Sequence, residues 1–99
     1  MNLQNNQVIQ KVWEKGYIVY GYDPEKYRKD VCGAWMIRDV YGCRDNIYGW
    51  EIDHITPASH GGSDSLYNLR PLQWNNNASR QDGRLKPVVI SNGNKNEYK

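Results

Sequence analysis

The chain has 99 residues, which is enough for one compact domain with a modest core. Its formal net charge is only +2, and no apolar run is long enough for a signal peptide or a membrane span. We therefore expect a soluble intracellular domain without a membrane partner. Four Trp and eight Tyr, with no Phe, supply the bulky side chains of the core.

The charge is distributed unevenly along the chain. Residues 1–69 contain 7 Lys and Arg and 9 acidic residues, whereas residues 70–99 contain 6 and 2. A basic C-terminal third favours a polyanionic substrate, although solvated surface lysines explain the imbalance equally well. The charge therefore points to nucleic acid only in combination with a site.

The N-terminal third begins with a predicted helix. Residues 4–15 place four apolar side chains at helical spacing, and Gly16 follows as a stop. These four are Val8, Ile9, Val12 and Trp13. Residues 17–22 are β-prone, residues 24–29 are expected to form one helical turn, and residues 34–38 are a predicted strand.

The middle of the chain predicts a hairpin. Its strands are residues 34–38 and 50–53, and the connection between them is rich in Gly, Asp and Asn. Cys32 and Cys43 do not have the spacing of a zinc knuckle, so we expect two idle thiols in a reducing cytoplasm.

Beyond this hairpin the elements are short. Residues 57–65 are a predicted loop in which Gly61-Gly62 permits a sharp reversal. A short strand over 68–72 and a helix over 73–81 follow. Residues 91–99 are polar and are expected to be a disordered tail.

One constellation carries chemistry: Asp53 and His54 at a strand end, Asn68 beyond the Gly-Gly loop, and Asn77 in the predicted helix. Oxygen ligands suit a hard divalent cation, and an imidazole beside them suits a general base. Together they predict metal-assisted hydrolysis of a phosphodiester. An Asp-His pair alone is usually an ordinary pair of surface residues without a function. The two asparagines that follow at suitable spacing make the functional interpretation the better one.

Each member has an expected role. His54 accepts a proton from the attacking water, Asp53 and Asn77 bind the cation, and Asn68 holds backbone groups across the turn. Arg80 lies one helical turn beyond Asn77 and is expected to hold an adjacent phosphate. His60 has no partner at a suggestive spacing, so we expect it to be solvated or near DNA.

Residues 50–82, with the preceding CGAWMIRDVYG and YGWEIDH, closely resemble HNH endonucleases of the small stand-alone bacterial and phage type. The resemblance implies a ββα-metal fold in which His54 is the first motif histidine and general base. It makes Asn68 the central asparagine and Asn77 the third motif residue. Asp53 and Asn77 would then bind one catalytic ion, Mg²⁺ or Mn²⁺.

The chain departs from the family pattern at one place and leaves the position of one metal ligand undecided at another. Many members carry Cys-x-x-Cys ahead of the last motif residue, but here those positions are Gln73 and Asn76. We therefore expect no structural zinc, with packing by Trp50 and Trp74 in its place. The run Asn75-Asn76-Asn77 leaves Asn76 as an alternative ligand, although the motif spacing favours Asn77.

The expected architecture is a small single-domain α+β protein with a ββα-metal core, an N-terminal helix and an additional β-hairpin. The nuclease domain spans 1–90, its core about 50–82, and the tail 91–99.

The expected function is a cytoplasmic DNA endonuclease that nicks one strand of a duplex with low specificity, as a monomer or weak homodimer. One alternative is an accessory subunit that acts only with a larger phage-packaging or restriction partner. A nonspecific toxin domain is disfavoured by the modest charge, and RNA remains open as a substrate.

Overall fold

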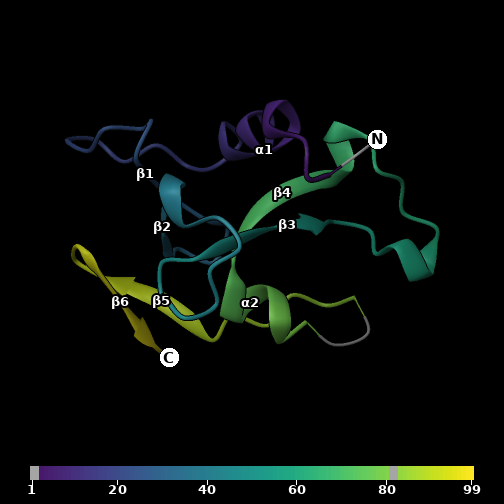
Figure 1. The fold of residues 1–99 in the computed structure, drawn as a ribbon. Coiled ribbons are helices and arrows are strands. Elements are labelled where there is room, and N and C mark those ends of the chain that lie inside the picture. The colour runs from purple at the N-terminus through teal and green to yellow at the C-terminus, as the bar shows by residue number, and fades with distance from the viewer. Residues whose placement is uncertain (1–2, 81–82) are drawn as a thin grey trace.

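A computed structural model describes residues 3–80 and 83–99 (Figure 1). It contains two α-helices and six strands in the described part of the chain. In chain order these are α1 (Asn6–Trp13), β1 (Tyr27–Lys29), β2 (Trp35–Ile37), β3 (Trp50–His54), β4 (Leu69–Gln73), α2 (Trp74–Ala78), β5 (Val89–Asn92) and β6 (Lys95–Tyr98). The strands form three antiparallel pairs, β1–β2, β3–β4 and β5–β6. The expected α+β class is confirmed.

The β3–β4 pair occupies the centre of the molecule, with α1 on one side and α2 on the other (Figure 1). Its register places Asp53 opposite Arg70 and His54 opposite Leu69. Helix α2 begins at the residue after β4, so strand, strand and helix follow one another in this part of the chain. The expected helix over 73–81 is shorter, and residues 81 and 82 lie outside the described residues.

The core lies between α1 and the β3–β4 pair. Helix α1 starts where the Asn5 side chain accepts a hydrogen bond from the Gln7 amide, and it buries one apolar face. The ring centroids of Trp13 and Trp50 are 5.2 Å apart, and both side chains are fully buried. The helical spacing of the N-terminal apolar residues therefore did indicate a packing helix.

Strand pairing in the first half differs from the expected hairpin. Strand β2 pairs with β1, and β3 pairs with β4. Residues 24–29 were expected to be helical, but after a turn over 24–26 residues 27–29 form β1. The reason is local, because Asp23 accepts the Glu25 amide and closes a turn that delivers the chain to β2. Residues 17–22 are not a strand apart from one bridge at Tyr17.

The C-terminal segment forms a hairpin of β5 and β6, which corrects the expectation of a disordered tail over 91–99. Its attachment is polar. The Asn96 side chain accepts from the Trp35 amide at 2.7 Å and donates to the Trp35 carbonyl at 2.8 Å. The Trp35 indole donates to the Gly93 carbonyl. These contacts satisfy backbone groups of β2, which explains why a polar segment is ordered.

None of the helices in residues 3–80 and 83–99 has the length and apolar character needed to cross a membrane. Cys32 and Cys43 are free thiols. Burial raises the pKa of the Cys32 thiol to about 12, so it stays protonated and unreactive near neutral pH.

Candidate active site

An open cleft of about 330 Å³ lies where the end of β3 meets α2. Four of the residues expected to act in the site line it, from two separated stretches of the chain. They are Asp53, His54, Asn77 and Arg80. Asn68 is not among the lining residues. The cleft brings an imidazole, a carboxylate and an amide to one solvent-accessible place.

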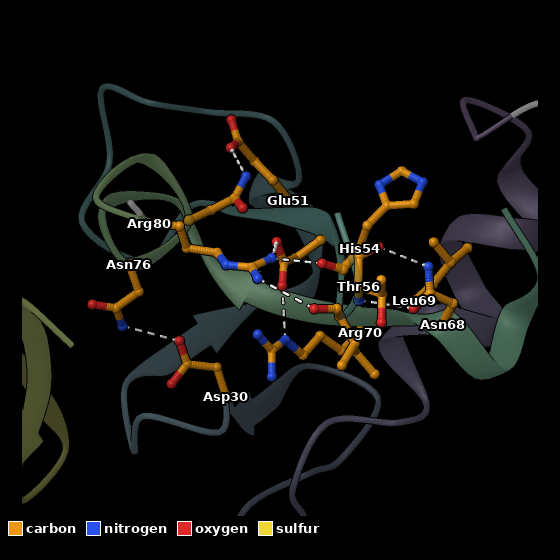
Figure 2. Close-up of polar contacts among 12 residues, drawn as sticks. Asp30, Glu51, His54, Thr56, Asn68, Leu69, Arg70, Asn76 and Arg80 are labelled. Carbon is orange, nitrogen blue, oxygen red and sulfur yellow. Dashed lines mark hydrogen bonds and ion pairs between the residues drawn. The ribbon is translucent and has the colours of Figure 1, made fainter. Parts of the chain in front are cut away.

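Asp53 is buried, and each of its carboxylate oxygens accepts a hydrogen bond from an arginine. The two arginines, Arg70 and Arg80, are labelled in Figure 2. Oδ2 accepts from Arg70 Nε at 2.7 Å, and Oδ1 accepts from Arg80 Nη1 at 2.6 Å. Arg70 comes from the facing position of β4. A buried carboxylate needs such partners, and here two guanidinium groups compensate one negative charge.

Arg80 is turned toward the protein. Its Nη1 also donates to the His54 carbonyl, and its Nη2 donates to the Ile55 and Gly83 carbonyls. Its Nε is buried and has no hydrogen-bond partner among the described residues. The expected contact with an adjacent phosphate therefore requires that the guanidinium first leave Asp53. In this structure Arg80 bridges the segment that follows α2 and the end of β3.

His54 ends β3, and its imidazole is about one-fifth exposed. Its Nε2 lies 2.7 Å from Oδ1 of Asp64, a half-exposed residue of the 57–65 loop. Sequence reasoning missed Asp64, since that loop was read only as a connection. The available signal was an acid ten positions after the histidine, within a loop that Gly61-Gly62 folds back.

Asn68 ties that loop to the strand pair. Its Oδ1 accepts from the Thr56 amide at 2.9 Å, and its Nδ2 donates to the Thr56 and Ser63 carbonyls at 3.1 and 2.7 Å. Gly62 is required nearby, because a Cβ there would lie 1.7 Å from the Thr56 carbonyl oxygen. This geometry suits the supporting role expected for Asn68.

The two asparagines that compete as ligands point to different places. Asn77 lines the cleft, and its Nδ2 donates to Glu51 Oε1 at 2.8 Å. Asn76 is fully buried, and its Oδ1 accepts from the Val88 and Val89 amides. With its amide oxygen already bonded twice inside the protein, Asn76 is poorly placed to bind an ion.

Gln73 and Asn76 stand where many HNH members have cysteines, and both belong to a buried cluster with Asp30. Asp30 Oδ2 accepts from the Gln73 amide and from Asn76 Nδ2, while its Oδ1 accepts from the Cys32 and Ala34 amides. Burial raises the pKa of Asp30, against the opposing effect of these bonds.

Tryptophan packing accounts for only part of this region. Trp50 is buried as expected. Trp74 is only half-buried, with the Arg44 guanidinium over its ring at 5.6 Å. The expectation that both tryptophans pack in the place of a zinc site therefore stays a prediction. Hydrogen bonds of the Asp30 cluster hold this region together.

Glu51 is a second residue that sequence reasoning missed. It accepts two hydrogen bonds from Arg44, at 2.7 and 2.9 Å, and one from Asn77. The bond from Arg44 is the largest cause that lowers the pKa of Glu51. The pair holds Glu51 ionised at neutral pH, and Glu51 in turn orients the Asn77 amide at the cleft.

The donor chemistry of the cleft fits a hard divalent cation. Asp53 offers carboxylate oxygens, and Asn77 offers Oδ1 because its Nδ2 is used by Glu51. The described residues contain no group of three or more His, Cys, Asp or Glu arranged around an ion. An ion here would take most ligands from water and phosphate, as Mg²⁺ does. The two arginines on Asp53 show that this carboxylate already attracts positive charge.

Comparison with known proteins gives one match. Residues 41–81 match the family model described as HNH endonuclease, and this range contains Asp53, His54, Asn68, Asn77 and Arg80. No curated protein and no solved structure matches the chain. The match indicates a nuclease with DNA as its substrate and a divalent metal as its usual cofactor. The resemblance seen in the sequence is thus confirmed for residues 41–81, which match the HNH endonuclease family model.

Proposed function

We propose that this protein is a Mg²⁺- or Mn²⁺-dependent endonuclease that hydrolyses phosphodiester bonds of duplex DNA, one strand at a time. The observation that carries the proposal is the shared cleft, which His54, Asp53 and Asn77 all line. The family match over residues 41–81 supports the reaction class. One cleft of this size accommodates one scissile phosphate, so an isolated chain should nick.

In the reaction His54 takes a proton from a water molecule as that water attacks phosphorus. Asp53 and Asn77 would hold the cation. When bound, such a cation neutralises phosphate charge and stabilises the leaving 3′-oxygen. Asn68 keeps the 57–65 loop in place beside His54 through its bonds to Thr56 and Ser63.

A second function, cleavage only within a larger complex, is favoured by one observation. Both oxygens of Asp53 accept hydrogen bonds from arginines in the isolated chain, so a cation there competes with two guanidinium groups, and a partner that moves one of them would favour the ion. Substrate DNA, with its phosphates, can draw Arg80 away by itself. We therefore favour an enzyme that acts alone.

The test is a nicking assay on supercoiled plasmid with Mg²⁺ or Mn²⁺. We expect open circles that disappear with EDTA and with His54→Ala. The matched control is His60→Ala, which removes the other histidine, an exposed residue of the neighbouring loop, and should nick normally. The rate should fall as salt rises, because binding releases counterions from DNA. If His54→Ala nicks as fast as the wild type, His54 is not the general base. Inactivity of the wild-type chain would favour the partner-dependent function.

A further inference from the structure

We propose that Asp64 positions the catalytic imidazole: it holds the proton of His54 on Nε2 and so makes Nδ1 the atom that accepts the proton from water. The inference deepens the proposed function and rests on it. It names a residue from the loop as part of the site, and it assigns the reacting atom of the base. It is carried by the 2.7 Å contact between His54 Nε2 and Asp64 Oδ1.

The chemistry of the contact fixes where the proton lies. An ionised carboxylate can only accept hydrogen bonds, so the ring nitrogen that faces it has to donate. A separation of 2.7 Å is typical of such a charge-assisted bond. A neutral imidazole carries one N–H only, so with Nε2 protonated the lone pair lies on Nδ1.

The orientation of the ring agrees with this assignment. In Figure 2 the two ring nitrogens of His54 face opposite ways, and one of them faces the side where Glu51 and Arg80 lie. That side includes the cleft, which is lined by His54, Arg80 and Asn77. Since Nε2 is bonded to Asp64, the nitrogen free to serve the cleft is Nδ1.

The loop is built so that Asp64 stays in place. Ser63, its neighbour, has its carbonyl bonded by Asn68 Nδ2 at 2.7 Å. Gly62 packs so closely on the Thr56 carbonyl that no side chain fits there. Asn68 therefore supports catalysis indirectly, since it anchors the backbone next to the carboxylate that orients His54.

The proton count of the step then closes. The oxygen of the attacking water forms a bond to phosphorus and gives one proton to Nδ1, while Nε2 keeps its own. The bond from phosphorus to the 3′-oxygen breaks, its electron pair leaves with that oxygen, and the oxygen takes a proton from solvent water. The imidazolium formed carries a positive charge, and the Asp64 carboxylate stabilises it at hydrogen-bond distance.

The alternative is an exposed ion pair without function, since Asp64 is half-exposed. The position of the ring proton separates the two, and it is measured in the metal-free protein by ¹⁵N correlation spectra of the histidine rings. His60→Gln assigns the signals, because the chain has two histidines. We expect a protected Nε2–H and an unprotonated Nδ1 in the wild type, and an exchange-broadened mixture of both forms in Asp64→Ala.

The second arm compares nicking rates. Asp64→Ala should lower kcat about ten- to a hundredfold with little change in KM for DNA, as loss of an orienting partner does. Asp64→Glu should restore part of both the rate and the spectrum. Asp45→Ala, which removes an exposed acid elsewhere, is the matched control and should change neither.

The outcomes separate this inference from the proposed function. A wild-type proton on Nδ1, or an Asp64→Ala protein with unchanged spectra and rate, would overturn the role of Asp64 even if nicking by the wild type stands. Conversely, a wild-type protein that shows the Nε2–H signal but never nicks would support the ring orientation and overturn the proposed cleavage by the isolated chain.

Discussion

Asn76 and Asn77 are neighbours in α2, yet they serve two regions of different character. Asn76 faces the buried cluster with Asp30 and Gln73, where each side chain makes its hydrogen bonds within the protein. Asn77 faces the open cleft with Asp53 and His54. Successive residues of a helix are rotated by about 100°, so Asn76 points into the protein and stabilises the fold, whereas Asn77 points into the cleft.

The comparison shows what a polar residue needs in each place. In the cluster, the buried polar groups are hydrogen-bonded to one another, and loss of any one removes bonds from its partners in a buried region. In the cleft, Asp53 is also buried, but its partners are cations that a metal ion can replace in kind. A buried polar side chain whose hydrogen-bond partners are neutral amides therefore has a structural role. A buried carboxylate whose partners are charged groups beside an open cleft is a candidate site residue.

The largest effect should come from Asn76→Ala. It would leave the Val88 and Val89 amides without the Asn76 acceptor and remove one of the two hydrogen bonds to Asp30 Oδ2, which should reduce the free energy of unfolding by roughly 2–4 kcal/mol. Asn77→Ala, the matched variant, should cost less than about 1 kcal/mol. Urea unfolding followed by tryptophan fluorescence measures both. Equal losses of unfolding free energy in the two variants would contradict the separation between a structural cluster and a functional cleft.

Gly62→Ala should be the next largest. The added Cβ would lie 1.7 Å from the Thr56 carbonyl, so the loop has to shift, at a cost of about 1–3 kcal/mol, and nicking should fall because the loop moves away from His54. Gly61→Ala is the control, since its Cβ enters open space and only the φ of +85° opposes it. Urea unfolding and plasmid nicking should rank Gly62→Ala as the worse variant, and the reverse order contradicts the account.

Asn77→Ala should affect metal use at nearly unchanged stability. Loss of one ligand oxygen should raise the Mn²⁺ concentration needed for half-maximal nicking at least tenfold, which corresponds to about 1.4 kcal/mol. Asn75→Ala, in the same helix, should leave this concentration unchanged. If Asn76→Ala, assayed where it is folded, shifts the Mn²⁺ requirement and Asn77→Ala does not, the ligand position is off by one residue.

Arg44→Ala should have the smallest effect, and the effect should depend on pH. The Arg44 bond lowers the pKa of Glu51, so its stabilisation is present above the ordinary pKa of a glutamate and is lost as pH falls through the lowered pKa. We expect a loss of up to about 1 kcal/mol at pH 7, since Arg44 is more than half exposed. Unfolding curves of the two proteins should converge in acid. A constant difference across pH would assign the effect to packing on Trp74.

Local patterns in the sequence predicted the elements that depend on local physics. Helix α1 follows from apolar spacing, and the turn after β3 follows from Gly61-Gly62. The pairing of β1 with β2 and the C-terminal hairpin did not follow. The hairpin depends on bonds between Asn96 and Trp35, 61 positions apart, which no local pattern reveals.

The candidate site divides in the same way. The spacing of Asp53, His54 and Asn77 was enough to expect them together, and the structure places all three on one cleft. Their partners were not predictable, because Arg70 reaches Asp53 only through the register of β3 and β4, and Asp64 reaches His54 only through the path of its loop. The roles in metal binding and catalysis remain predictions.

The most direct test of the central claim is a crystal soaked in Mn²⁺, examined by anomalous diffraction. We expect one peak at coordination distance from the Asp53 carboxylate and Asn77 Oδ1, with Arg80 moved off Oδ1 of Asp53. A saturating soak that leaves both arginines on Asp53 and shows no peak in the cleft would contradict it.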